Sequence, residues 1–99
     1  MTERLTAEHF LPHVTKTFRV VGGRHALTLT HVDMGRREER ERTAQAFQPF
    51  NLIFSGPPGD VLAEGLYIVE VEGGPSFELY VMPIHTAERS RQDYQSLWN

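Results

Sequence analysis

The chain has 99 residues, of which 39% are hydrophobic and 23% charged, an ordinary composition for one soluble globular domain. Cysteine is absent, which excludes disulfides and cysteine-ligated metal sites, and ten Lys and Arg against 13 Asp and Glu argue against a nucleic-acid binder. No apolar run approaches the roughly 20 residues of a membrane span, and no secretory leader pattern is present. We therefore expect a single cytoplasmic domain over residues 1–99 that binds neither nucleic acid nor membranes.

Residues 1–14 predict a short N-terminal helix. Thr6 suits the N-cap position, because its hydroxyl can accept a hydrogen bond from a free N–H of the first turn. Pro12 limits the helix, because proline removes a hydrogen-bond donor and collides with the preceding turn. The apolar positions expected to form one stripe are Leu5, Phe10, Leu11 and Val14.

From residue 15 onward the pattern changes to β, with β-branched and aromatic residues between turns that contain Gly and Pro. The predicted strands are 15–21, 25–34, 49–55, 65–72 and 77–84, and a sixth, short strand at 93–98 lies in a tail that begins at residue 85. Strands at this spacing predict a mainly β fold. We expect a small antiparallel meander over 15–84 that curls into a five- or six-stranded barrel or sandwich.

Gly22 and Gly23 predict a two-residue turn between the first two strands, of type I′, which needs a positive φ at both central positions. This turn sets Phe18 opposite Leu27 and leaves one face of the hairpin apolar and the other polar. His31 extends the apolar row, where we expect a rim or core histidine rather than a metal ligand.

The apolar rows of the last two strands share a face only if the loop between them has an odd number of residues. A three-residue loop would place Pro75 in the left-handed position that its ring forbids. We therefore predict a five-residue loop over 72–76, with Val71 opposite Phe77.

The outward face of that last hairpin is apolar where a half-solvated sheet should be polar. The predicted register sets Ile68 opposite Tyr80 and Leu66 opposite Met82. Either the N-terminal helix or the tail covers this face, or a protein partner or a second copy of the chain binds it, since large exposed apolar patches usually mark interaction sites. Leu66, Ile68, Tyr80 and Met82 are therefore candidate interaction residues.

Two further segments are expected to build the core. Phe50, Leu52 and Phe54 alternate with other residues and predict an inward-facing row. In the tail, Tyr94 and Trp98 share one side of the short strand. Chain ends fray unless they are tied down, so these aromatics predict docking, on this sheet's edge or on a neighbouring subunit.

The residues show no catalytic, cofactor-binding or metal-binding constellation. His9 and His13 have the spacing of a helical metal pair, but Pro12 lies between them and the Glu of the helical zinc motif is missing. We expect no bound metal and no cofactor. Glu70 and Glu78, opposite each other in the predicted hairpin, are interpreted as a solvated acidic pair.

Residues 35–46 contain a dense run of charges of both signs, which nearly cancel. A solvated loop is the simplest interpretation, and a docking element is the alternative. The candidate interaction residues of this segment are Arg36, Arg37, Arg40 and Arg42.

Short motifs form an ordered series along nearly the whole chain. They are Leu5-Thr6-Ala7-x-x-Phe10, Phe18-x-Val20, Phe50-x-Leu52-x-Phe54-x-Gly56-Pro57, Leu62-x-x-Gly65-Leu66-Tyr67, Phe77-x-Leu79-x-x-x-Pro83-Ile84 and Tyr94-x-x-x-Trp98-Asn99. The series resembles a bacterial family of domains of this length and of unknown function. The resemblance lends no catalytic residue. It implies gene neighbours that resemble phage-tail-collar proteins, and hence an accessory or structural role in a tail-like or surface-fibre assembly.

We expect a non-enzymatic interaction or assembly module. Two alternatives stay open: a β-barrel that binds a small ligand inside, and an enzyme that uses residues from strand ends. Bulky side chains inside a small barrel count against the first. A deep polar pocket would favour the second if it held two or more of His25, His31, His85, Glu70 and Glu78.

Overall fold

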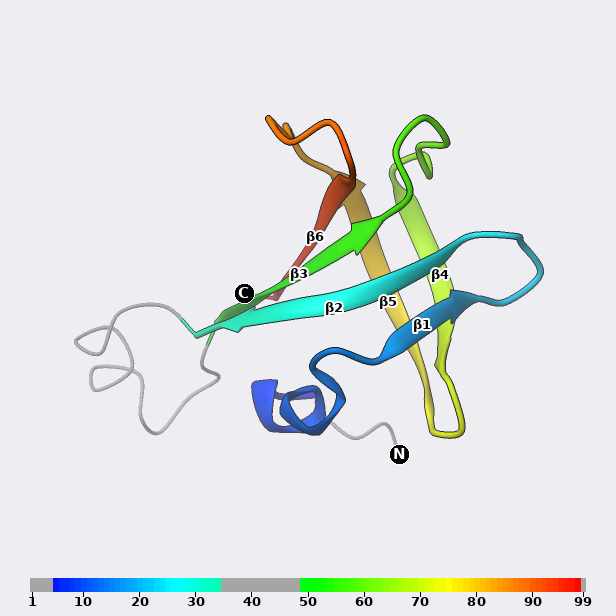
Figure 1. Ribbon diagram of the computed structural model, residues 1–99. Helices are drawn as coiled ribbons and strands as arrows, with labels where there is room; N and C mark the ends of the chain where they lie inside the picture. The colour runs from blue at the N-terminus through cyan, green and yellow to red at the C-terminus, as the bar shows by residue number, and fades with distance from the viewer. Residues whose placement is uncertain (1–4, 35–48, 99) are drawn as a thin grey trace.

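The computed structural model describes residues 5–34 and 49–98, in which the chain forms two short 3₁₀ helices and six β-strands (Figure 1). The helices are η1 (Ala7–His9) and η2 (Leu11–His13), and the strands are β1 (Thr17–Val20), β2 (Ala26–Asp33), β3 (Phe50–Gly56), β4 (Gly65–Val71), β5 (Ser76–Pro83) and β6 (Gln92–Trp98). Every predicted strand is present, with each end within two residues of its predicted place. Within this part of the chain, no helix has the length and apolar character needed to cross a membrane.

The six strands close into an antiparallel barrel in the order β1-β2-β3-β6-β5-β4 (Figure 1). This confirms the mainly β barrel, but the order differs from a simple meander, because β3 pairs with β6 and β1 pairs with β4. The segment between β3 and β4 does not turn back as a hairpin. It crosses one end of the barrel, where the buried Leu62 is hydrogen-bonded to Tyr94.

Alternate residues of the strands point inward and fill the barrel. The predicted inward row of β3 is confirmed, since Phe50, Leu52 and Phe54 are all buried. The other strand residues of the buried core are Phe18, Val20, Leu27, Leu29, Val69, Val71, Phe77, Leu79, Val81 and Tyr94.

The register predicted for the first hairpin is confirmed, with Phe18 opposite Leu27. The type I′ turn is wrong, because only Gly22 has a positive φ, of 83°, and Gly23 does not. The Val20 N–H donates to the His25 carbonyl at 3.0 Å, so the loop spans residues 21–24 instead of the two glycines alone. Both loops are centred on the same point of the chain, so the longer loop leaves the register unchanged.

The register predicted for the last hairpin is wrong by two residues. Val69, and not Val71, lies opposite Phe77. The chain turns at Gly73, which takes the positive φ of 72°, so the left-handed position never falls on Pro75. A shift of two residues leaves every side chain on its predicted face, because side chains alternate with a period of two.

A β-bulge in β2 reverses the predicted direction of His31. Leu29 pairs with Phe54, but the next pair is His31 with Ile53, so Thr30 is an extra residue in the ladder. The Thr30 hydroxyl donates a hydrogen bond to the Ile53 carbonyl at 3.1 Å. His31 therefore leaves the inner row and is exposed.

The N-terminal helical segment packs at one end of the barrel. Its 3₁₀ winding repeats every three residues, which places Ala7 and Phe10 on the same side, and both are buried. The ring centroid of Phe10 lies 4.6 Å from that of Phe77 and 6.0 Å from that of Trp98. Leu11, expected in the apolar stripe of a helix with a longer repeat, is instead exposed.

Strand β6 docks the tail on this chain, one of the two predicted alternatives. It pairs with β3 along its whole length, from Gln92 to Trp98. The Trp98 ring stacks on Phe50, with centroids 5.5 Å apart and ring planes 8° apart. The tail is therefore part of the barrel wall.

Candidate functional site

Four exposed apolar side chains lie together on the outside of β4, β5 and the end of β1. We call Val21, Leu66, Ile68 and Tyr80 the apolar face. Leu66 lies opposite Tyr80 in the β4–β5 ladder. On the other edge of β4, the Val21 N–H donates to the Ile68 carbonyl at 2.9 Å, which places Val21 beside Ile68. Ile68 lies diagonally across the ladder from Tyr80, within reach of an aromatic side chain, so the four residues are neighbours on one outer surface.

The apolar face is open to solvent. The exposed fractions are 56% for Val21, 62% for Leu66, 53% for Ile68 and 45% for Tyr80. The N-terminal helix packs at the barrel end around Phe10, and the tail forms strand β6 in the wall. In residues 5–14 and 85–98, the described parts of the two segments expected to cover this face, neither segment covers it.

A carboxylate fixes one end of the apolar face. The Tyr80 hydroxyl donates a short hydrogen bond to the Glu64 carboxylate. This hydrogen bond, partial desolvation and the nearby negative charge raise the pKa of Tyr80 above its ordinary value of 10.0. This hydrogen bond therefore links the Tyr80 ring to the segment just before β4.

The register shift changes which predicted interaction residues meet. Ile68 lies opposite Glu78 and not opposite Tyr80. Met82 is half-buried, pairs with Gln95 of β6, and accepts a hydrogen bond from the Gln95 side chain at 3.4 Å. Leu66 thus meets Tyr80 in place of Met82, because both predicted pairs move by two residues.

The four arginine candidates are not described by the structure, and one residue of the apolar face was not predicted. Arg36, Arg37, Arg40 and Arg42 lie outside the described residues. Val21 was not among the candidates. The alternation of Val20 inward with its neighbours outward could have indicated it, but its place beside β4 depends on the β1–β4 pairing.

A hollow of about 330 Å³ adjoins the apolar face at the first hairpin, lined by residues 19–26 and Glu70. It brings together two of the strand-end residues of the enzyme alternative, His25 and Glu70. Arg24 in its wall is bound to Asp60, through Nε to Oδ2 at 3.1 Å and Nη2 to Oδ1 at 2.8 Å. His25 Nε2 lies 3.4 Å from the same Oδ1. The hydrogen bond from Arg24 lowers the pKa of Asp60, and the pair ties this hairpin to the segment before β4.

Comparison with known protein families assigns the chain to one family. The family described as "Domain of unknown function (DUF6916)" matches residues 5–97. The chain belongs to the DUF6916 family. No curated protein and no solved structure matches it. The family name of this DUF6916 chain carries no activity, so the function has to be argued from the geometry of its surface.

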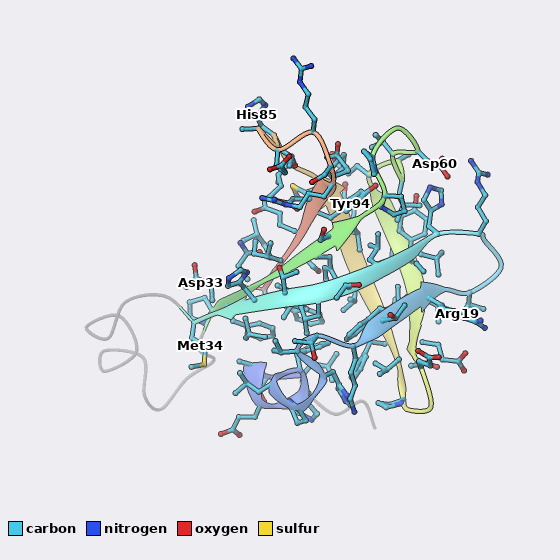
Figure 2. The ribbon with its side chains drawn as sticks, in the orientation of Figure 1. Arg19, Asp33, Met34, Asp60, His85 and Tyr94 are labelled. Atoms are coloured by element: carbon cyan, nitrogen blue, oxygen red, sulfur yellow. The ribbon has the colours of Figure 1, made fainter. Side chains whose placement is uncertain are left out.

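The histidines of the DUF6916 chain do not gather into one site. His25 lies beside Asp60, whereas Figure 2 shows His85 and Asp60 on opposite sides of one barrel end. Nδ1 of His9 accepts a hydrogen bond from the Thr6 N–H at 3.0 Å. In residues 5–34 and 49–98, no group of three or more His, Asp or Glu is placed to hold a metal ion.

The predicted acidic pair is absent, because Glu70 lies opposite Ser76 and Glu78 lies opposite Ile68. The register shift moves the two glutamates from directly opposite to diagonal positions, so they do not form the facing pair that was expected.

The interior of the barrel is filled by side chains. Phe18 packs edge-on against Phe54, with ring centroids 5.2 Å apart, and Tyr94 is fully buried. Leu62 covers one end of the barrel and Phe10 the other. The hollow at the first hairpin lies on the outer surface, so it does not correspond to the interior ligand site that a binding barrel would need.

Proposed function

We propose that this DUF6916 chain is a non-enzymatic interaction module that docks a protein partner on its apolar face. The observation that carries the proposal is the exposure of Leu66, Ile68 and Tyr80 side by side on neighbouring strands. Large side chains exposed together usually mark an interaction site, and Tyr is one of the residues that contribute most to binding energy at interfaces.

The backbone beneath the apolar face supports the same proposal. The inward residues of β4 and β5, among them Val69, Phe77 and Leu79, are buried in the barrel core. The outward side chains therefore stand on a ladder that is fixed from below. A surface formed in advance loses little conformational entropy when a partner binds, which favours binding.

The setting that we propose is accessory to a tail-like or surface-fibre assembly in the bacterial cytoplasm. It rests on the ordered motif series of the sequence, which ends in Tyr94-x-x-x-Trp98-Asn99. The docking face rests on a separate observation, the exposure of the β4–β5 side chains. The two parts of the proposal therefore stand independently of each other.

A pull-down from the native host with the tagged full chain tests the proposal. Tyr80→Arg places a charge on the apolar face, and Leu11→Arg is the matched control, because Leu11 is also exposed but lies on η2. We expect that a host protein binds to the wild-type chain and to Leu11→Arg but not to Tyr80→Arg. Circular dichroism should show that both variants are folded. Equal retention by the two variants contradicts docking on the apolar face.

A further inference from the structure

The charges of the chain are distributed unevenly around the apolar face. Residues 55–84, which contain β4 and β5, include five acidic residues and no Lys, Arg or His. The rest of the chain holds all ten Lys and Arg together with the other eight acidic residues. The segment that carries most of the apolar face is therefore the acidic part of an otherwise slightly basic chain.

Three of these carboxylates border the apolar face. Glu64 lies two residues before Leu66, and Glu70 lies two residues after Ile68. Glu78 lies opposite Ile68 on β5. Alternate residues of a strand share a face, so Glu70 lies on the outward face of β4 with Leu66 and Ile68. Glu64, just before β4, meets the Tyr80 hydroxyl at the other end of the apolar face.

Two of the bordering carboxylates have no cationic partner within the part of the chain that the structure describes. The ion pairs there join Arg24 and His25 to Asp60, and Arg91 to Asp93. Glu70 and Glu78 take part in none of them, although Arg19 lies opposite Glu70 in the β1–β4 ladder. A carboxylate that a partner brings out of water needs an opposite charge, because burying an unpaired charge is costly.

On the strength of the proposed function, we infer that the partner is a protein segment with apolar side chains flanked by Lys or Arg. Its apolar residues would cover Leu66, Ile68 and Tyr80, and its cations would meet Glu70 and Glu78. Such opposite charges at the rim of an interface select the partner and speed its association. A second copy of the chain fits this surface less well, because a symmetric contact would place the same carboxylates against each other.

A random peptide library displayed on phage and selected on the immobilised full chain tests this inference without a known partner. Peptides that bind the wild-type chain but not the double variant Leu66→Ser with Ile68→Ser bind the apolar face, and we call them face-dependent peptides. Glu70→Gln with Glu78→Gln then removes only the charges. Glu8→Gln is the matched control, because Glu8 is exposed on η1 and belongs neither to the apolar face nor to the carboxylates that border it.

We expect face-dependent peptides to combine apolar residues with a net positive charge and to weaken as salt is added. Glu70→Gln with Glu78→Gln should weaken them roughly threefold to tenfold, the effect of losing two exposed charge pairs, and Glu8→Gln should not. Face-dependent peptides of zero or negative charge overturn the inference and leave the proposed function standing. A dimer of the chain that the double Ser variant abolishes overturns the inference and also the docking of a different protein on this face. Recovery only of peptides that bind the double Ser variant equally well contradicts both.

Discussion

The backbone N–H of Leu62 donates a hydrogen bond to the hydroxyl of Tyr94 at 2.9 Å, and both residues are buried. This bond joins the segment that crosses the barrel end to β6, a strand 32 residues further along the chain. The crossing is what carries β4 away from β3 and lets it pair with β1. This buried hydrogen bond is thus one contact that holds the crossing segment on the barrel end.

We expect Tyr94→Phe to lower the free energy of unfolding by about 1–3 kcal/mol, because it leaves a buried N–H without an acceptor. Urea denaturation measures the change. The matched control is Tyr67→Phe, which removes an exposed hydrogen bond to the Ala63 carbonyl and should cost less than about 1 kcal/mol. Equal costs for the two variants would show that the buried bond has no special weight.

Trp98→Ala should lower the free energy of unfolding by about 2–3 kcal/mol, somewhat less than the ~3–5 kcal/mol of a fully buried large aromatic residue. The reason is the loss of its contacts with Phe50 and Phe10 at the end of the barrel. Denaturation of the wild-type chain and of Trp98→Ala, followed by circular dichroism, measures the change in the free energy of unfolding. A cost below about 0.5 kcal/mol, the range of ordinary surface substitutions, would mean that Trp98 does not hold β6 in place.

Replacing the centre of the apolar face should barely affect folding. We expect Leu66→Ser with Ile68→Ser to change the free energy of unfolding by less than about 1 kcal/mol, because both side chains are already mostly in water. The matched control on β5 is Leu79→Ala, a buried position where truncation should cost about 2–5 kcal/mol. A double variant as damaging as the control would mean that the native chain itself covers this face.

The pKa of Tyr80 should respond to Glu64. Its pKa in the folded protein is raised above the ordinary value of 10.0, so the contact contributes its full stability below pH 10 and loses it as the pH rises through the folded pKa. We expect Glu64→Gln to lower the pKa of Tyr80 toward 10.0. The pKa is measured from the NMR chemical shift of the tyrosine ring carbons as the pH is raised, and Tyr80→Phe serves to assign the Tyr80 signal. An unchanged pKa in Glu64→Gln would show that this hydrogen bond does not form in solution.

Local patterns predicted the strands because each strand and each turn depends on neighbouring residues. The first hairpin shows why register also could be predicted, since the loop at Gly22 keeps its centre whether it has two or four residues. The last hairpin shows the opposite case. There the position of the positive φ on Gly73 decides the register, and the sequence pattern alone centred that turn one residue later, which moves every cross-strand partner by two.

The pairings between distant strands could not be predicted from local patterns. The bulge at Thr30, which turns His31 outward, depends on how β2 fits β3. Leu66, Ile68 and Tyr80 were identified because alternation alone places them outside the barrel. Val21 joins them only through the β1–β4 contact, which brings together residues 47 positions apart in the Val21–Ile68 hydrogen bond.

Cross-linking in the native host tests the docking face most directly. A photo-reactive amino acid replaces Ile68 in one version of the full chain and Leu11, exposed on η2, in the other. The account predicts one discrete adduct from position 68, heavier than the chain by a partner that is not a second copy, and none of that mass from position 11. No adduct from position 68, or the same adduct from both positions, would contradict the claim that the apolar face docks a protein partner.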